Sequence, residues 1–254
     1  MTTRDGKGPD LQRSLTLLWS GRARGQRGPR PKLSVAQIAD AAVRIADADG
    51  LEALSMQRIA AELGYSTMSI YNHIPSKDLL LEVAADVAAG QPPELDRTAD
   101  FRPAVRHWVG ALWAGFHSRP WLLRVPLDHA PVGPNQLAWL DRLLQPLLAA
   151  GLVGGEARAA ALHLTAVVRG TAQISLSLTN GHTGADLAQA IDELIDPDGY
   201  PGLAAVHAAE VAGSRLAEDG TMTAELSFGV ERFLDGVEAW VAAETRRDSD
   251  NRDN

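Results

Sequence analysis

The fold is decided by the stretch SMQRIAAELGYSTMSIYNHIPSKDLL, residues 55–80. Its first part has the apolar spacing of a short helix over residues 56–63, which Gly64 can end in a left-handed conformation. Ser66 can then cap a second short helix over residues 67–73. Two short helices joined by a tight, glycine-containing turn are typical of a helix-turn-helix, although a capped surface turn in any helical protein has the same local pattern.

The helical pattern continues on both sides of this motif. Apolar residues at spacings of three and four predict a helix over residues 34–49, and a further helix is expected over residues 77–89. The run Gln-Pro-Pro at residues 91–93 breaks the pattern. We therefore expect an N-terminal domain over residues 33–90, in which a three-helix helix-turn-helix core is followed by a fourth helix.

The remaining chain, residues 91–245, also has helical spacing and lacks the period-two alternation of strands. The expected fold class is all-α, with the N-terminal helix-turn-helix domain followed by a larger helical domain. The polar residues 246–254 are expected to form a disordered tail. The expected helices of the larger domain span residues 102–117, 120–126, 134–150, 155–180, 185–195, 202–213 and 222–245.

The composition restricts the chemistry of the chain. Its 254 residues carry 24 Lys and Arg against 32 Asp and Glu, a formal net charge of −8, and include no cysteine. The absence of cysteine excludes disulfides, cysteine-bound zinc, iron–sulfur clusters and a thiol nucleophile. No nucleophile elbow, zinc-protease helix or phosphate-binding glycine loop is present, and no apolar run is long enough to span a bilayer. We expect a cytoplasmic protein that is neither an enzyme nor membrane-bound, with no metal and no cofactor.

The charge is unevenly distributed along the chain. Residues 1–33 contain eight basic and two acidic side chains, or +6, whereas residues 91–254 contain 13 basic and 22 acidic ones, or −9. Residues 1–32 are expected to form a flexible basic arm, in which residues 11–19 could form a short amphipathic helix. Such an arm can enter a DNA minor groove and neutralise phosphates, although a solubilising tail has the same composition. Its candidate DNA contacts are Arg24, Arg27 and Arg30.

Three motifs stand in order in the N-terminal domain: Leu-Gly at residues 63–64, Ile-Tyr-Asn-His at residues 70–73 and Lys-Asp-Leu-Leu at residues 77–80. With them, residues 33–89 resemble the DNA-binding domain of the TetR (tetracycline-repressor) family. The larger domain is similar more loosely, chiefly through ELSFGVERFLDGVE at residues 225–238, to the branch nearest the tetracycline repressor itself.

The resemblance implies a set of DNA contacts. The second helix of a helix-turn-helix lies in the major groove, where its N-terminal side chains reach base edges. Gln57 would reach a base or a phosphate, Tyr71 would donate to a phosphate, and Lys77 would attract a phosphate at a helix N-terminus. The residues expected to read or brace the groove are Ser66, Thr67, Ser69, Asn72 and His73. Packing of the Tyr71 ring, solvation of Lys77 and a backbone contact of His73 are the competing interpretations.

The resemblance also implies a homodimer that binds a double-stranded DNA operator with two half-sites. The family pairs its two longest body helices, here 155–180 and 222–245, with those of a second copy in a four-helix bundle. The expected interface residues are Gly170, Ile174, Ser177, Phe233, Val237 and Trp240. An intrachain core would use the same apolar residues.

A small-molecule effector site is expected between the remaining helices. Aromatic residues are concentrated there in a chain that otherwise has few, and an apolar pocket with a few polar anchors is typical of ligand sites. The candidate lining residues are His107, Trp113, Phe116, His117, Trp121, Trp139, His163 and Gln173. Ordinary core packing is the alternative. The pair Asp128-His129 alone is too little for a metal site.

The sequence thus predicts a ligand-responsive DNA-binding transcriptional regulator. We expect a repressor that binds a palindromic operator as a dimer and is released by a small apolar or aromatic effector. In this mechanism the effector shifts the first body helix, which moves the fourth helix and changes the separation of the reading helices. The alternatives are activation of transcription, or an all-α ligand-binding or scaffolding protein that does not bind DNA.

Overall fold

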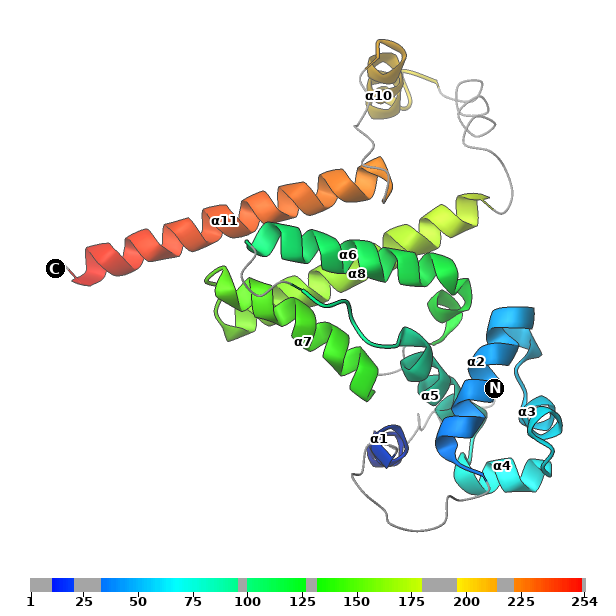
Figure 1. The fold of residues 1–254 in the computed structure, drawn as a ribbon. Coiled ribbons are helices and arrows are strands. Elements are labelled where there is room, and N and C mark those ends of the chain that lie inside the picture. The colour runs from blue at the N-terminus through cyan, green and yellow to red at the C-terminus, as the bar shows by residue number, and fades with distance from the viewer. Residues whose placement is uncertain are drawn as a thin grey trace, which may run out of the picture. The chain divides into compact units, whose positions relative to one another are not determined.

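A computed structural model describes residues 11–20, 33–95, 100–126, 132–179, 196–213 and 222–252. Every regular element in these residues is a helix, as the all-α expectation requires (Figure 1). The chain divides into two compact units. The first unit comprises the chain up to Asp96 together with Ser118–Gln145, and the second unit comprises Arg97–His117 together with Pro146–Asn254.

The helix-turn-helix is confirmed, and its helices begin and end where the sequence predicts. Helix α2 (Val35–Asp49) is followed by the turn η1 (Leu51–Ala53), α3 (Met56–Leu63), α4 (Thr67–His73) and α5 (Lys77–Ala89). Their apolar faces enclose one core, in which the largest fully buried side chains are Ile38, Leu54, Ile59, Ile70, Ile74 and Leu80.

Serine caps explain why these four helices start sharply. In each case the serine hydroxyl oxygen accepts a hydrogen bond from the backbone N–H three residues later, which satisfies a donor that the helix leaves unpaired. Each such cap contributes about 1 kcal/mol. Gly64 ends α3 at φ +73°, a left-handed conformation that glycine adopts without strain. The capping serines are Ser34, Ser55, Ser66 and Ser76.

A helix replaces part of the flexible arm expected over residues 1–32. Residues 11–20 form α1 (Leu11–Ser20), which packs against α5. Leu18 is buried with Ala39 of α2 and Val83 of α5. The short amphipathic helix considered for this stretch therefore exists, and its apolar side covers two helices of the same chain.

The first unit extends beyond the boundary expected at residue 90. It includes the turn η2 (Pro120–Arg124) and helix α7 (Pro134–Ala149) as far as Gln145. Trp121 and Val125 are buried in the same core as the helix-turn-helix. Residues 118–145 are therefore part of the compact unit that contains α4.

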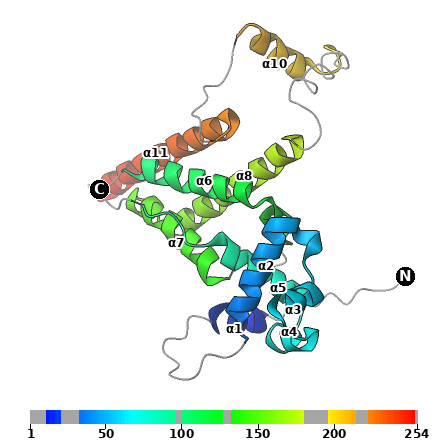
Figure 2. The same ribbon diagram turned by 45° about the vertical axis from the view of Figure 1, so that its right-hand side comes forward.

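The second unit is built on α6 (Phe101–Ser118), α8 (Gly154–Thr179) and α11 (Ala224–Arg252), which lie side by side in Figures 1 and 2. It also contains α10 (Pro201–Val211). Buried residues of this unit include Val105, Trp108, Leu147, Leu164, Leu226 and Leu234.

The last helix of the chain is longer than expected. Helix α11 runs to Arg252, so the disordered tail expected from residue 246 is wrong over residues 246–252. Arg247 in this stretch pairs with Glu244 three residues earlier, and pairs at this spacing support an exposed helix. The helix expected over residues 185–195 lies outside the described residues.

Candidate nucleic-acid interface

Helix α4 presents one face to solvent. Met68, Tyr71 and Asn72 are exposed on this face at positions i, i+3 and i+4, whereas Ile70 points into the core and is fully buried. Tyr71 is 43% exposed, so its ring is not a core element and its hydroxyl is accessible. Thr67, at the start of the helix, is partly exposed. The exposed face of α4 carries no formal charge.

Three of the predicted reading residues are occupied within α4. The Oγ atoms of Ser66 and Ser69 lie 2.9 Å apart, and the Ser69 N–H donates to Ser66 Oγ at 3.2 Å. The Nδ1 of His73 lies 2.9 Å from the carbonyl oxygen of Ser69, so Nδ1 carries the hydrogen and donates it. Ser66, Ser69 and His73 therefore brace the helix through these bonds, and the predicted contact residues Tyr71 and Asn72 are exposed beside them.

Gln57 and Lys77 are exposed within the first turns of α3 and α5. Helix N-termini present unpaired N–H groups that favour phosphate oxygens. Of the three basic residues between positions 34 and 90, Arg44 pairs with Glu62 and Arg58 pairs with Asp49. Lys77 has no ion pair among the residues that the structure describes.

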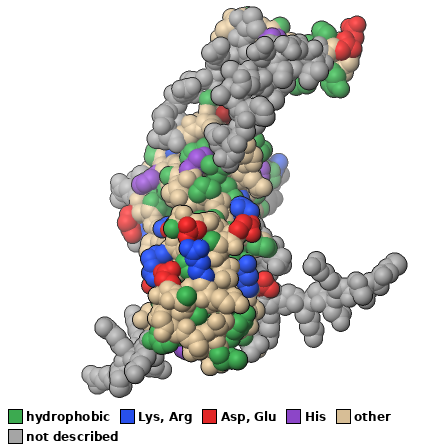
Figure 3. All heavy atoms as spheres, turned by 90° about the vertical axis from the view of Figure 1, so that its right-hand side faces the viewer, with side chains coloured by type: hydrophobic (Ala, Val, Ile, Leu, Met, Phe, Trp, Pro, Cys, Tyr) green, Lys and Arg blue, Asp and Glu red, His purple; other side chains and the backbone are tan. Residues whose placement is uncertain are grey.

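The distribution of charged side chains on the surface agrees with an uncharged exposed face of α4. Within the first unit, Figure 3 shows mainly tan and green atoms at the height where α4 lies in Figure 1, and charged side chains gathered above it. The basic residues Arg24, Arg27 and Arg30 of the arm lie outside the described residues, as do Asp128 and His129.

A buried carboxylate fastens α5 to α7 within the first unit. Asp86 is 2% exposed, and its Oδ1 accepts hydrogen bonds from the backbone N–H groups of Asn135 (3.0 Å) and Gln136 (2.9 Å). The Asn135 Nδ2 donates to the Asp86 carbonyl oxygen at 2.9 Å. Asp86 thus caps the N-terminus of α7, where a negative charge is favoured. A Cβ atom at Gly133 would lie 2.1 Å from Asp86 Oδ1, so this position has room only for glycine.

Two tryptophans also attach residues 118–145 to the helices of the first unit. They are Trp121 and Trp139, both of which were predicted to line an effector pocket. The indole N–H of Trp121 donates to Asp47 of α2 at 2.7 Å. The indole N–H of Trp139 donates to the carbonyl oxygens of Ala89 and Gly90 at 3.1 and 3.2 Å, at the end of α5. Both tryptophans hold residues 118–145 against helices of the first unit.

Other side chains add to this attachment. The Arg119 Nε donates to Asp47 at 3.1 Å, and its Nη1 donates to the carbonyl oxygen of Ala88 at 3.1 Å. The indole N–H of Trp19 in α1 donates to the carbonyl oxygen of Val132 at 3.1 Å. Helices α1, α2 and α5 are therefore all tied to the segment 118–145.

The other predicted pocket residues lie in the second unit, where three of them form a group. Trp113 and Phe116 are buried on α6, and the ring of His117 lies 4.2 Å from that of Trp113, centroid to centroid. The guanidinium of Arg169 on α8 lies 5.8 Å from the centre of the Phe116 ring. Burial lowers the pKa of Arg169 below its ordinary value. Arg169 was not predicted, and its signal is a lone charge in the apolar run of residues 166–172.

The remaining predicted pocket residues are placed elsewhere. His107 and Gln173 are exposed, and the ring of exposed His163 stacks on Phe233 with centroids 5.3 Å apart. The structure therefore groups Trp113, Phe116 and His117 on α6, whereas the contacts of Trp121, Trp139 and His163 are with other residues.

Helices α8 and α11 expose large apolar side chains. Ile174 on α8 is 62% exposed, and Phe228 and Trp240 on α11 are 52% and 47% exposed. Trp240 also donates its indole N–H to Glu156 at 2.9 Å. Of the predicted interface residues, Ser177 is exposed, Gly170 and Phe233 are partly exposed, and Val237 is buried in the unit itself.

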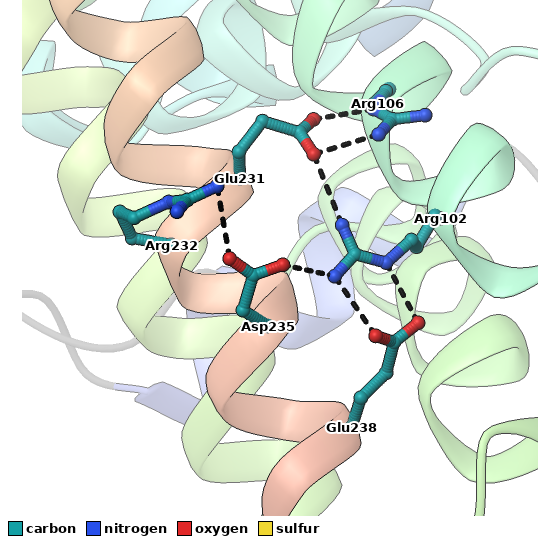
Figure 4. Close-up of polar contacts among 6 residues, drawn as sticks. All are labelled: Arg102, Arg106, Glu231, Arg232, Asp235 and Glu238. Carbon is teal, nitrogen blue, oxygen red and sulfur yellow. Dashed lines mark hydrogen bonds and ion pairs between the residues drawn. The ribbon is translucent and has the colours of Figure 1, made fainter.

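An ion-pair cluster joins α6 to α11 (Figure 4). The guanidinium of Arg102 donates to Glu231 at 3.0 Å and to Glu238 at 2.7 Å, and it also contacts Asp235. Arg106 donates to Glu231 at 2.7 Å. Hydrogen bonds from Arg106 lower the pKa of Glu231, and hydrogen bonds from Arg102 lower the pKa values of Asp235 and Glu238. The first body helix is thus held at its N-terminal end.

The described residues contain no group of three or more His, Asp or Glu side chains placed to hold a metal ion. Within the same residues, no helix has both the length and the hydrophobicity needed to cross a bilayer.

Two family models match the chain. The one described as bacterial regulatory proteins, tetR family, matches residues 38–84, and the one described as tetracyclin repressor-like, C-terminal domain, matches residues 93–241. The second match alone covers more than half of the chain. The interval between the two matches, residues 85–92, contains the end of α5.

Relatives and solved structures give the same result. The HTH-type transcriptional repressor DrrR1 of Streptomyces coeruleorubidus is 33% identical over 255 residues, which cover 95% of this chain and 90% of DrrR1. Structures of the TetR family protein ActR from Streptomyces coelicolor, in complex with (S)-DNPA and with actinorhodin, are each 26% identical, with TM-scores of 0.66 and 0.67. They cover 84% of this chain and 100% and 99% of ActR.

The exposed reading helix, the serine-capped helix-turn-helix and these matches lead to one conclusion. The chain belongs to the tetR family of bacterial regulatory proteins and is a DNA-binding transcriptional regulator.

Proposed function

We propose that this regulator is a repressor that binds a palindromic operator as a homodimer and leaves it when a small aromatic or apolar effector binds. The observation that carries the proposal is the exposed face of α4, with Tyr71 and Asn72 accessible and Ser66, Ser69 and His73 bracing the helix from within. Asn can bond adenine through two hydrogen bonds, and a tyrosine hydroxyl can donate to a phosphate.

Most of the attraction to phosphates must come from outside α4. Residues 34–90 carry three basic and eight acidic side chains, whereas residues 1–33 carry +6. We therefore assign the main electrostatic contribution to the basic arm, through Arg24, Arg27 and Arg30, with Lys77 as a further phosphate contact. This DNA-binding role places the protein in the cytoplasm.

Dimerisation through α8 and α11 brings in a second copy of α4, which binds the second half-site of the operator. Ile174, Phe228 and Trp240 are exposed large apolar side chains of these two packed helices that a second copy would cover. Phe233, Gly170 and Ser177 lie on the same helices.

The effector domain of this proposal is the second unit. The Arg169 guanidinium of α8 lies over the Phe116 ring of α6, and Trp113 and His117 of the same helix pack on each other, so the unit combines aromatic rings with a partly buried cation. The similar ActR is known in complex with (S)-DNPA and actinorhodin, which makes these two compounds suitable first probes. Effector binding releases DNA to the extent that it favours one of two states of the protein over the other.

The test is a binding titration of the full chain with palindromic duplexes from the upstream region of its own gene, at several salt concentrations. The proposal requires binding that weakens as salt rises and that decreases on addition of actinorhodin or (S)-DNPA. Absent or salt-independent binding would contradict the DNA-binding part. Salt-dependent binding that no aromatic compound weakens would contradict the effector part alone.

A further inference from the structure

The second residue of α4 is the most exposed large apolar side chain of the described residues. Met68 is 69% exposed, ahead of Val153 at 65% and Ile174 at 62%. It lies on the same face as Tyr71 and Asn72, three and four residues later. An apolar side chain therefore stands at the N-terminal end of the reading face, where side chains of a helix-turn-helix reach base edges.

The neighbours of Met68 leave it no partner within α4. Ile70 supplies the core contact of the helix, and Ser66, Ser69 and His73 bond to one another or to the backbone. Helix α4 carries no arginine or lysine to provide the common contact to guanine. The exposed face of α4 thus offers polar groups and one thioether, that of Met68.

The major groove offers one apolar group to such a side chain. Each base edge there presents hydrogen-bond donors, acceptors or both, and thymine alone adds a C5-methyl group. Methionine is unbranched, flexible and polarizable, so it adapts to a small apolar target. We infer that Met68 reads a thymine methyl group in each half-site, which makes it a specificity-determining residue. This inference rests on the proposed operator binding by α4.

A contact of Met68 with the DNA backbone is the competing interpretation. Single exposed apolar side chains are common on protein surfaces, and Met68 could also lie against a deoxyribose, where it would help binding without reading sequence. Thr67, one residue earlier, carries a methyl group that can itself contact thymine. The experiment has to separate these contacts from a thymine methyl contact of Met68.

The operator is first obtained by selection of the full-length protein on random duplexes. Each thymidine of one half-site is then replaced in turn by deoxyuridine, which lacks the C5-methyl group and keeps all hydrogen-bonding groups. Loss of one buried methyl contact corresponds to about a fourfold weaker Kd. We expect this loss at one position for the native protein and for Met68→Leu, and no loss there for Met68→Ala.

The variant Thr67→Ser is the matched control, because it removes the neighbouring methyl group and keeps the hydroxyl. It should discriminate thymidine from deoxyuridine as the native protein does. If discrimination persists in Met68→Ala, or disappears in Thr67→Ser instead, Met68 is not the reader. If Met68→Ala weakens all duplexes equally and deoxyuridine has no effect, the contact is to the backbone and the inference is wrong. Failure to select any sequence would overturn the proposed operator binding, and this inference with it.

Discussion

At the scale of single residues, Lys77 is the clearest candidate for an electrostatic contact with DNA. It is exposed in the first turn of α5, after the cap Ser76, and has no ion pair among the described residues. Replacing Lys77 with alanine should remove one phosphate contact, weaken binding to all sequences alike and reduce the slope of log Kd against log salt by about one unit. The measurement is a fluorescence-anisotropy titration at several salt concentrations.

Arg44→Ala is the matched control for this prediction. Arg44 is also an exposed cation of the first unit, but it is paired with Glu62 at 2.8 Å. Its replacement should leave the salt slope as it is. Equal slopes for native protein and Lys77→Ala would show that Lys77 does not bind a phosphate.

At the scale of the elements, the junction between α5 and α7 depends on one carboxylate. Asp86→Asn keeps the shape of the side chain but removes its negative charge at the N-terminus of α7. If the amide nitrogen takes the position of Oδ1, the hydrogen bonds from Asn135 and Gln136 are lost as well. Loss of buried hydrogen bonds to a charged group costs about 2 kcal/mol. We expect the free energy of unfolding to fall by about this amount in urea titrations.

Gly133→Ala should have a similar effect, because its methyl group would displace the Asp86 carboxylate. Gly110→Ala on α6 is the control, since a Cβ atom there meets nothing within 4 Å and alanine is favoured in a helix interior. An Asp86→Asn protein as stable as the native one would mean that the cap contributes nothing.

The ion-pair cluster between α6 and α11 predicts a pH dependence. The pKa values of Glu231, Asp235 and Glu238 are lowered in the folded protein, so their contribution to stability is present above the unfolded-state pKa and is lost as pH falls through the folded-state pKa. The difference in Tm between native protein and Arg102→Gln should be largest at neutral pH and should shrink below about pH 4. It should also shrink at high salt. If the difference in Tm between the native protein and Arg102→Gln did not change with pH, the ion pairs of Arg102 would not be the source of this stability.

Local signals account for what could be predicted from the sequence. Serine caps, Gly64 and apolar spacing act within a few residues, which is why the helices of the reading domain were placed correctly. The hydrogen bonds of Trp121 and Trp139 join residues 74 and about 50 positions apart, and composition cannot reveal such partners. The sequence therefore indicated aromatic residues of interest without indicating which ones hold the first unit together.

On the exposed face of α4, too, the sequence predicted the helix but not the hydrogen bonds of its side chains. The resemblance to a family supplied a correct helix and a set of polar residues, but the sequence could not show which hydroxyls were already bonded within α4. That depended on the geometry of Ser66, Ser69 and His73 in the folded helix.

At the scale of the whole molecule, operator binding depends on the proposed dimer. Replacing Ile174 and Phe228 together with glutamate would place two charges in the interface, where unpaired charges are costly. We expect a monomer by analytical ultracentrifugation and strongly weakened binding to a two-half-site operator, because a single half-site gives little affinity.

Leu148→Glu provides the comparison, since Leu148 is similarly exposed, at 49%, but lies on α7 outside the proposed interface. This variant should remain a dimer. A dimeric Ile174→Glu/Phe228→Glu protein would place the interface elsewhere on the molecule.

The attachment of residues 118–145 has a consequence for exchanging parts between regulators. A chimaera that joined only residues 33–90 to a foreign body would strip Asp86 and Asp47 of the partners that α7 and η2 provide. The transferable module is discontinuous in the chain: it consists of α1 through α5 together with the stretch from Ser118 to Gln145. A change of operator specificity by recombination would have to carry both segments, and a single crossover after α5 divides one folding unit in two.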